Sequence, residues 1–228
     1  MAGRKKSKEN QETAKDRLLL AAVKLFALKG YEGTTTRQIA AEAGSSISML
    51  NLYYGTKEKL YEAAMEHIMD VCIRQNISVF KDIIDSRQME SDNIERIWEM
   101  IEKLTDLLLR IIRSPEYQYE VLLLNRELQD RQQSFRQIEP ILMFFYNYEL
   151  LFEAYTKSPP NTDWARELSF VTVTGMLSEI SYPKLYGHLV STDINMEERV
   201  RFAKEYHLCA IRETLKSHKN RWPYKYID

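Results

Sequence analysis

The residues best suited to chemistry lie between positions 35 and 59, where the chain reads TTRQIAAEAGSSISMLNLYYGTKEK. Thr35 and Gln38 have the spacing of a capping box that starts a short helix, and Ser46 can cap a second helix after a turn at Gly44. Two short helices joined by a tight turn, with the second exposed, place side chains in the DNA major groove. The stretch therefore predicts hydrogen bonding to base edges and phosphates.

The second short helix has two different sides. At about 100° per residue, Ile47, Leu50 and Tyr54 fall on one side and are expected to pack against the preceding helices. The rest carries Met, Leu and Tyr, which are unusual on a solvated surface but suit thymine methyl groups, sugars and phosphates. Asn51 is the best candidate for direct base reading, because an amide can pair with adenine N6 and N7. Periodicity alone slightly favours the alternative, an ordinary corner of a helical bundle.

Neighbouring side chains suit the DNA backbone. Tyr53 and Lys57 are suited to phosphates, and the start of the next helix offers backbone N–H groups to another phosphate. Thr35, Thr36 and Arg37, at the start of the first short helix, are placed to hold the backbone. Arg37 can also reach a guanine edge.

Charge is divided unevenly along the 228 residues. Residues 1–61 contain 11 Lys and Arg against 6 Asp and Glu, a net charge of +5, whereas the remaining residues have a net charge of −6. A basic head on an acidic body fits a nucleic-acid contact confined to the N-terminus. The alternative is a chance division with a disordered basic tail, GRKKSK.

Apolar residues recur with helical spacing along nearly the whole chain, and no segment alternates as a strand does. We therefore expect an all-α protein of about nine helices. Pro140 either kinks one long helix or marks its true start. The expected helices are 11–29, two short helices that begin at Thr35 and Ser46, a long helix after Thr56, 93–113, a helix that starts at Ser114-Pro115, and 133–157, 162–186 and 196–218.

Three segments resemble the tetracycline-repressor (TetR) family of bacterial regulators: FALKGYEGTT (26–35), RQIAAEAG (37–44) and SISMLNLYYGTKEKLY (46–61). The resemblance covers residues 10 to about 65. Ser45, Ser48 and Asn51 depart from the Val, Gly and Tyr that are usual in the family, so the contact made at Asn51 differs. The phrase LNLYYGTKEKLY is similar to a family branch that carries Asn there.

The resemblance implies a flexible basic tail at 1–9, a helix-turn-helix DNA-binding domain at 10–56 and an effector-binding and dimerisation domain at 57–228. It implies a ligand-responsive regulator, by family habit a repressor, that binds a palindromic operator in double-stranded DNA as a homodimer. Carried onto matching positions, it implies DNA contacts by Thr35, Thr36, Arg37, Ile47, Ser48, Met49, Asn51, Leu52, Tyr53 and Lys57.

The last two expected helices are candidates for a dimer interface. One recognition helix reads only a half-site, so two copies are expected. Apolar residues surround the segment LSFVTVTGMLSEISY (168–182), and its small residues allow close approach, whereas ordinary core helices are the alternative. The resemblance also implies a four-helix interface here. The candidate interface residues are Val171, Thr174, Gly175, Ser178, Val200, Ala203, His207, Ala210, Ile211 and Thr214.

The resemblance further implies a pocket in the body for a small hydrophobic or aromatic effector. Asn125 lies on an apolar helical face, where a structural hydrogen bond explains it better than ligand contact does. Each aromatic candidate is more often plain core than ligand contact. The candidate pocket residues are Trp98, Leu104, Asn125, Phe144, Phe145, Tyr148 and Phe152.

Other functions find less support in the sequence. It has no P-loop, no dinucleotide glycine fingerprint, no HExxH and no paired Cys motif, so we expect neither an enzyme nor a cofactor or metal. Two cysteines, no secretory signal and no apolar stretch long enough to span a bilayer favour a cytoplasmic protein without membrane contact. The main rival is a helical protein-interaction module with a degenerate head, which would lack salt-dependent binding to duplex DNA.

Overall fold

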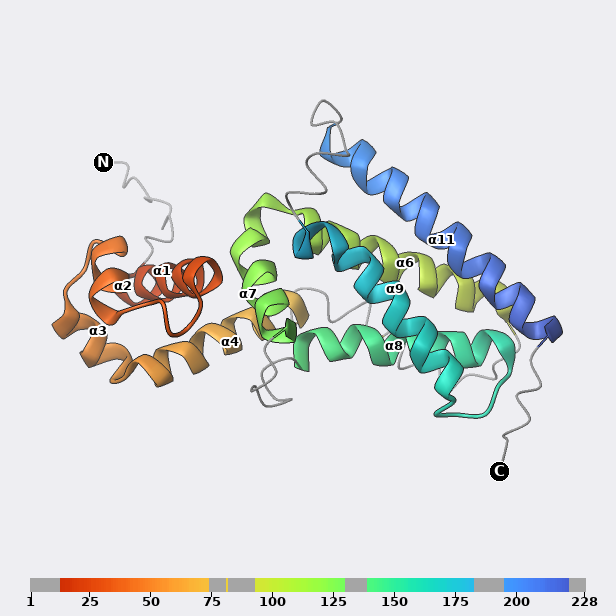
Figure 1. Ribbon diagram of the computed structural model, residues 1–228, viewed down its shortest axis with the longest axis horizontal. Helices are drawn as coiled ribbons and strands as arrows, with labels where there is room; N and C mark the ends of the chain where they lie inside the picture. Colours follow the sequence, from red (N-terminus) through yellow and green to blue (C-terminus); the bar gives the residue numbers. More distant parts are fainter. Residues whose placement is uncertain (1–12, 74–80, 82–92, 130–138, 183–194, 222–228) are drawn as a thin grey trace, which may run out of the picture. The chain divides into compact units, whose positions relative to one another are not determined.

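The computed structural model describes residues 13–73, 81, 93–129, 139–182 and 195–221. Within these ranges all regular structure is helical, with nine α-helices, one 3-10 helix and no strand (Figure 1). The all-α prediction is confirmed. The predicted tail at 1–9 lies outside the described residues.

The N-terminal helices are α1 (Ala14–Lys29), α2 (Thr36–Glu42), α3 (Ile47–Tyr54) and α4 (Lys57–Ile73). Each begins directly after a hydroxyl residue that accepts a hydrogen bond from a backbone N–H in the first turn: Thr13, Thr35, Ser46 and Thr56. Such caps satisfy donors that the helix itself leaves without partners. The predicted capping box of α2 is confirmed, because Gln38 N donates to Thr35 Oγ1 at 3.3 Å and Thr35 N donates to Gln38 Oε1 at 3.0 Å.

The remaining helices are α6 (Ile94–Arg113), the 3-10 helix η2 (Pro115–Tyr117), α7 (Gln118–Gln129), α8 (Glu139–Thr156), α9 (Asp163–Ser181) and α11 (Met196–Arg221). Pro140 is the second described residue of α8, and the residues before Glu139 lie outside the described part of the chain, so the two alternatives for Pro140 are not tested. The expected stretches 133–138 and 183–186 lie outside the described residues.

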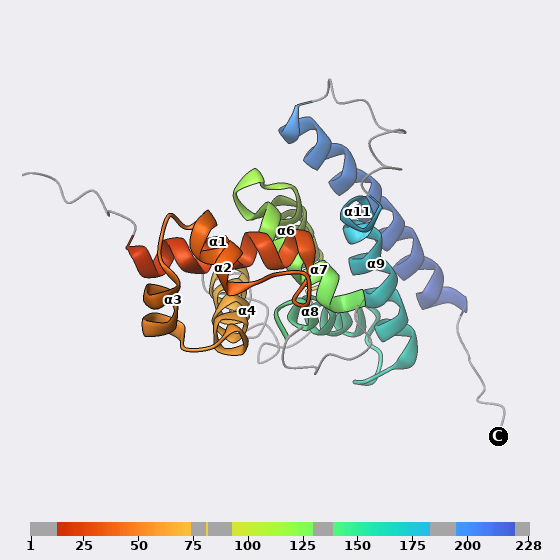
Figure 2. The same ribbon diagram turned by 60° about the vertical axis from the view of Figure 1, so that its left-hand side comes forward.

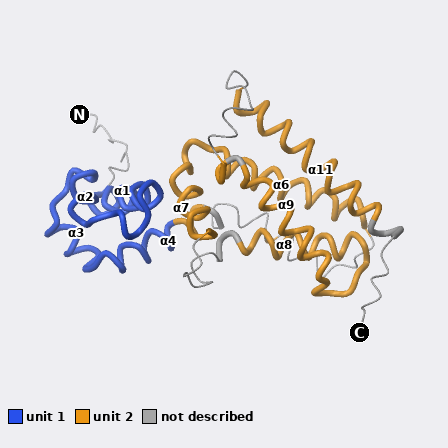
Figure 3. Tube along the Cα trace, in the orientation of Figure 1, with its two compact units in different colours: residues 1–67 blue, residues 68–228 orange. Residues whose placement is uncertain are grey.

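The chain divides into two compact units, residues 1–67 and 68–228 (Figure 3). The boundary between these units falls inside α4, after His67. The reason is packing, because Leu60 and Ala64 are fully buried and the ring of Tyr61, also in α4, lies 5.0 Å from that of Phe26 in α1. The first part of α4 is therefore part of the head.

The head has a core of aliphatic residues closed by an aromatic cluster. Leu18, Phe26 and Leu50 are fully buried. The ring of Tyr61 meets Phe26 edge-on at 5.0 Å between centroids, and Tyr31 lies 5.8 Å from Phe26. Aromatic pairs at these distances add to the stabilisation from buried area, so the cluster fixes α1 against α4.

In the second unit α8 packs against both α6 and α9, and α11 packs on α6; the turned view shows the same neighbours (Figure 2). The interior is dominated by large side chains of α8. Phe144, Tyr148 and Phe152 are almost completely buried, and the rings of Tyr148 and Phe152 lie 5.5 Å apart.

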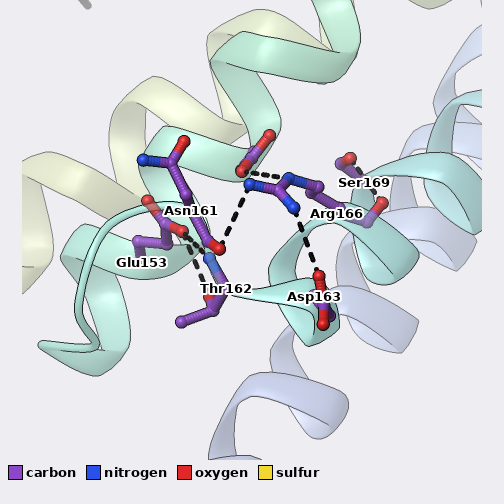
Figure 4. Close-up of polar contacts among 7 residues, drawn as sticks. Glu153, Asn161, Thr162, Asp163, Arg166 and Ser169 are labelled. Atoms are coloured by element: carbon purple, nitrogen blue, oxygen red, sulfur yellow. Dashed lines mark hydrogen bonds and ion pairs between the residues drawn. The ribbon is translucent and has the colours of Figure 1, made fainter.

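The corner between α8 and α9 is held by side chains of α8 (Figure 4). Thr162, the N-cap of α9, makes no side-chain capping bond, and Glu153 instead accepts from the Thr162 backbone N–H at 2.8 Å. Arg166 donates to Glu149 at 3.1 Å and to the carbonyl oxygen of Asn161 at 3.1 Å. A carboxylate at a helix start also suits the helix dipole, so α8 determines where α9 begins.

A buried hydroxyl pair links α6 to α8 and generates a stability prediction. Tyr148 and Thr105 are both fully buried, with their hydroxyl oxygens 2.8 Å apart, and Thr105 also donates to Ile101 O at 2.7 Å. Thr105→Val leaves the Tyr148 hydroxyl buried without this acceptor and should cost about 1–3 kcal/mol in the free energy of unfolding. In the Tyr148→Phe background, urea denaturation should show a clearly smaller cost. Equal costs in both backgrounds would contradict the pairing.

Candidate nucleic-acid interface

The turn between α2 and α3 is fixed by the backbone. Gly44 has φ +57°, in the left-handed region that favours glycine, and Ser45 N donates to Ala40 O at 2.8 Å. Ser46 then caps α3 by accepting from Met49 N at 3.2 Å. The two predicted short helices and their turn are confirmed as local structure.

The inner face of α3 is anchored by two residues. Leu50 is fully buried, and Tyr54 is buried with its hydroxyl donating to Lys15 O in α1 at 2.9 Å. Ile47 was expected to pack beside them but is 38 % exposed, so that expectation is wrong. Ile47 is the first residue of the helix, where no preceding turn covers it.

The outer face of α3 is exposed and partly apolar. Ser48, Asn51, Leu52 and Tyr53 are exposed, and Met49 is half-buried. Leu52 is 73 % exposed. A leucine held this far into solvent on a rigid, capped helix gains nothing from packing within the described chain, which is a feature of contact surfaces.

The start of α2 contributes polar groups to the head. Thr35 and Arg37 are exposed and Thr36 is half-buried. The Thr35 hydroxyl is already engaged as the helix cap, so its first role is structural. The Arg37 side chain is exposed on α2.

The start of α4 is more crowded than the sequence suggested. The Lys57 ammonium lies 3.9 Å from the centroid of the Tyr31 ring, and the Tyr31 hydroxyl donates to Glu58 Oε1 at 2.8 Å. The pKa of Glu58 lies below its usual range, because the carboxylate accepts from its own backbone N–H and then from Thr56 and Tyr31. The backbone N–H groups at the start of α4 were expected to be free for a phosphate, but that of Glu58 already has an anionic partner.

Burial, and next the hydrogen bond to Glu58, raise the pKa of Tyr31 to about 12. Tyr31 therefore stays protonated and remains a donor at neutral pH. Sequence reasoning missed the contact between Tyr31 and Glu58, because they are 27 residues apart and no local spacing pairs them.

The candidate pocket residues fall into separate groups. Leu104, Phe144, Tyr148 and Phe152 belong to the packed core. Phe145 is half-buried and stacks on the exposed Phe170 at 6.0 Å between centroids.

Trp98 and Asn125 have defined partners of their own. The half-buried Trp98 donates from Nε1 to Glu102 at 2.6 Å, and the Arg212 guanidinium lies 4.1 Å from its ring centroid. Asn125 is buried and its Oδ1 accepts from Ser181 Oγ at 3.1 Å. This bond between α7 and α9 supports the structural alternative for the amide.

The candidate dimer residues on α9 and α11 are mostly outward. Val171 is 58 % exposed, and Gly175, Ser178, Ala210 and Thr214 are exposed, whereas Thr174, Ala203 and His207 are half-buried and Val200 and Ile211 are buried within the chain. A Cβ placed on Gly175 would lie 3.5 Å from His207 Cε1, so α9 and α11 approach closely at that point. Beside the candidates lie exposed aromatic residues that were not predicted, Phe170, Phe202 and Tyr206.

Among the described residues, no group of three or more His, Cys, Asp or Glu side chains is arranged to hold a metal ion. In that same part of the chain, no helix combines the length and apolar character that a membrane span requires.

Residues 18–64 match the model of the family described as "Bacterial regulatory proteins, tetR family". The chain is 31 % identical over 91 residues to the HTH-type transcriptional repressor NicS of Pseudomonas putida, covering 40 % of this chain and 43 % of that protein. It is 44 % identical over 59 residues to the HTH-type transcriptional dual regulator CecR of Shigella flexneri, covering 26 % of each. The matched stretches thus span less than half the length of these relatives.

Solved structures match over more of the chain. A TetR-like transcriptional regulator from Rhodococcus sp. RHA1 has a TM-score of 0.61 at 18 % identity, covering 90 % of this chain and 97 % of that one. The ketosteroid transcriptional regulator KstR2 of Mycobacterium tuberculosis has a TM-score of 0.62 at 15 % identity, covering 88 % and 96 %. At this identity the likeness concerns the fold alone. Residues 18–64, which contain the two short helices and their turn, thus match the model of the tetR-family regulatory proteins, and the whole chain has a fold similar to these solved structures.

Proposed function

We propose that this chain is a ligand-responsive transcriptional regulator, a repressor that binds a palindromic operator as a homodimer and is released by a small hydrophobic effector. The observation that carries the proposal is the outer face of α3. Its exposed amide and apolar side chains, Asn51 and Leu52, stand opposite the buried anchors Leu50 and Tyr54. That face belongs to the segment with the family match, between residues 18 and 64.

Each exposed group has a role that its chemistry suits. Asn51 pairs with an adenine edge, and Leu52 contacts thymine methyl groups in the major groove. Arg37 and Tyr53 bind phosphates or, for Arg37, a guanine edge. Phosphate contacts set the register on the duplex, while base contacts select the sequence.

Two-fold pairing supplies the second recognition helix. The exposed residues Val171, Phe170, Phe202 and Tyr206 give α9 and α11 an apolar outer surface, which a second copy would bury. Gly175 and Ser178 are exposed there and small, so another helix can approach closely.

Release follows from linkage. An effector that binds best to a dimer with wrongly spaced heads lowers DNA affinity by its differential affinity for that state. Because the boundary between the two units falls inside α4, this helix is the natural lever between effector and operator.

Selection of bound sequences from a random duplex pool, at near-physiological salt, tests the proposal. We expect a palindromic motif with half-sites about one helical turn apart. Addition of small apolar compounds should then release the selected duplex. Absence of salt-dependent binding to any duplex would contradict the proposal and favour the protein-interaction module.

Two substitutions separate base reading from phosphate binding. Asn51→Ala should relax specificity at one base pair, with a loss of about 1–3 kcal/mol on the preferred sequence, because the amide pairs with a base edge. Lys57→Ala should weaken all sequences alike and reduce the salt slope by about 1, because it removes a phosphate contact. Fluorescence anisotropy on the selected duplex and its single-base variants measures both effects. If both variants weaken binding uniformly, Asn51 does not read a base.

The dimer surface gives a separate prediction. Val171→Glu places a charge on the exposed apolar face of α9 and should convert the dimer to monomer in sedimentation velocity, because a charge buried in an interface without a partner is costly. Leu20→Glu, which alters a 40 % exposed leucine of the head, is the matched control and should leave the dimer intact. Dimers of both variants would place the interface elsewhere.

A further inference from the structure

Two adjacent residues of opposite charge lie at the start of α4. Lys57 is a candidate phosphate contact, and Glu58 is an exposed carboxylate beside it. A carboxylate near DNA opposes binding, because each phosphate carries a negative charge. The head therefore has to present the ammonium of Lys57 to the duplex while keeping the carboxylate of Glu58 away from it.

Tyr31 contacts both charges with different parts of one side chain. Its ring lies under the Lys57 ammonium, 3.9 Å from centroid to Nζ, a close cation–π distance. Its hydroxyl donates to Glu58 Oε1 at 2.8 Å. The ring itself is held by Phe26 at 5.8 Å and by Tyr61 at 5.1 Å, so neither contact depends on a free rotamer.

The carboxylate remains an anion in this position. The pKa of Glu58 is lowered by its own backbone N–H, then by the Thr56 and Tyr31 hydroxyls, so the negative charge is present at neutral pH. Two of these three donors lie in the first turn of α4 and at its cap. The Tyr31 hydroxyl is the one that comes from a distant part of the chain, and it fixes the direction of the carboxylate.

We propose that Tyr31 is a positioning residue for DNA binding, which holds the Lys57 ammonium on its ring and the Glu58 carboxylate on its hydroxyl so that phosphates meet the lysine. The inference rests on the proposed function of the head. It adds to that function an aromatic residue that does not contact DNA itself but holds the Lys57 and Glu58 charges in place at the surface.

Tyr31→Phe tests the role of the hydroxyl, because it keeps the ring, its packing and the cation–π contact. Release of the carboxylate should weaken binding to all duplexes alike, by about threefold to tenfold near 0.1 M salt. Glu58→Gln in the Tyr31→Phe background should restore the affinity, because it removes the released charge. Glu58→Gln in the wild-type background is the comparison, because a merely structural role of Tyr31 would give the same gain in affinity in both backgrounds, whereas the positioning role gives a larger gain in Tyr31→Phe.

The ring is tested through the salt dependence. Tyr31→Leu should reduce the slope of log affinity against log salt by up to about 1, as Lys57→Gln does, and the two substitutions together should reduce it no further. Tyr54→Phe is the matched control, since it removes a head hydroxyl that donates to a backbone carbonyl. In the Tyr54→Phe background, Glu58→Gln should raise the affinity no more than it does in the wild-type protein.

Three outcomes are distinguishable. Wild-type protein without salt-dependent binding would overturn the proposed function and the inference with it. Wild-type binding that Tyr31→Phe leaves unchanged would overturn the positioning role alone. So would a loss in Tyr31→Phe that Glu58→Gln does not restore while circular dichroism shows the variant folded.

Discussion

The head depends on how α3 is fixed to α1. Leu50 is fully buried and the Tyr54 hydroxyl donates to the carbonyl of Lys15, so one side of an eight-residue helix is held by packing and by one long-range hydrogen bond. A helix this short would not be stable alone. Because Leu50 and Tyr54 fix the inner face, the helix turns Asn51 and Leu52 toward solvent. Their exposure is therefore a property of the folded head and can be used to infer function.

Local signals predicted most of the head. Thr35 with Gln38, Ser46 and Gly44 act within a few residues of themselves, so their types and spacing determine helix starts and the turn. The periodic apolar stripes likewise gave the helices of the body, because burial of one helical face follows directly from the spacing of residues along the chain.

Long-range polar contacts were not predictable in the same way. Tyr31 and Glu58 are 27 residues apart, and Glu153 caps α9 from the preceding helix. Such pairs follow from how helices meet, which a single sequence does not specify. Ile47 is a related case, since its position on the helical wheel predicts burial but, as the first residue of α3, it is 38 % exposed. The outer residues of the candidate site were thus easier to predict than the residues that hold them.

The packed interior of the second unit bears on how an effector would act. Leu104, Tyr148 and Phe152 are fully buried, so a ligand enclosed among them would displace side chains that already fill the core. Close-packed interiors respond by changing between discrete arrangements, because they have little room to deform gradually. The packing of the core with a ligand bound would then differ from its packing without the ligand, and the ligand would bind the two arrangements with different free energies. Under the proposed function, that difference in binding free energy between the two arrangements is what changes the affinity for DNA.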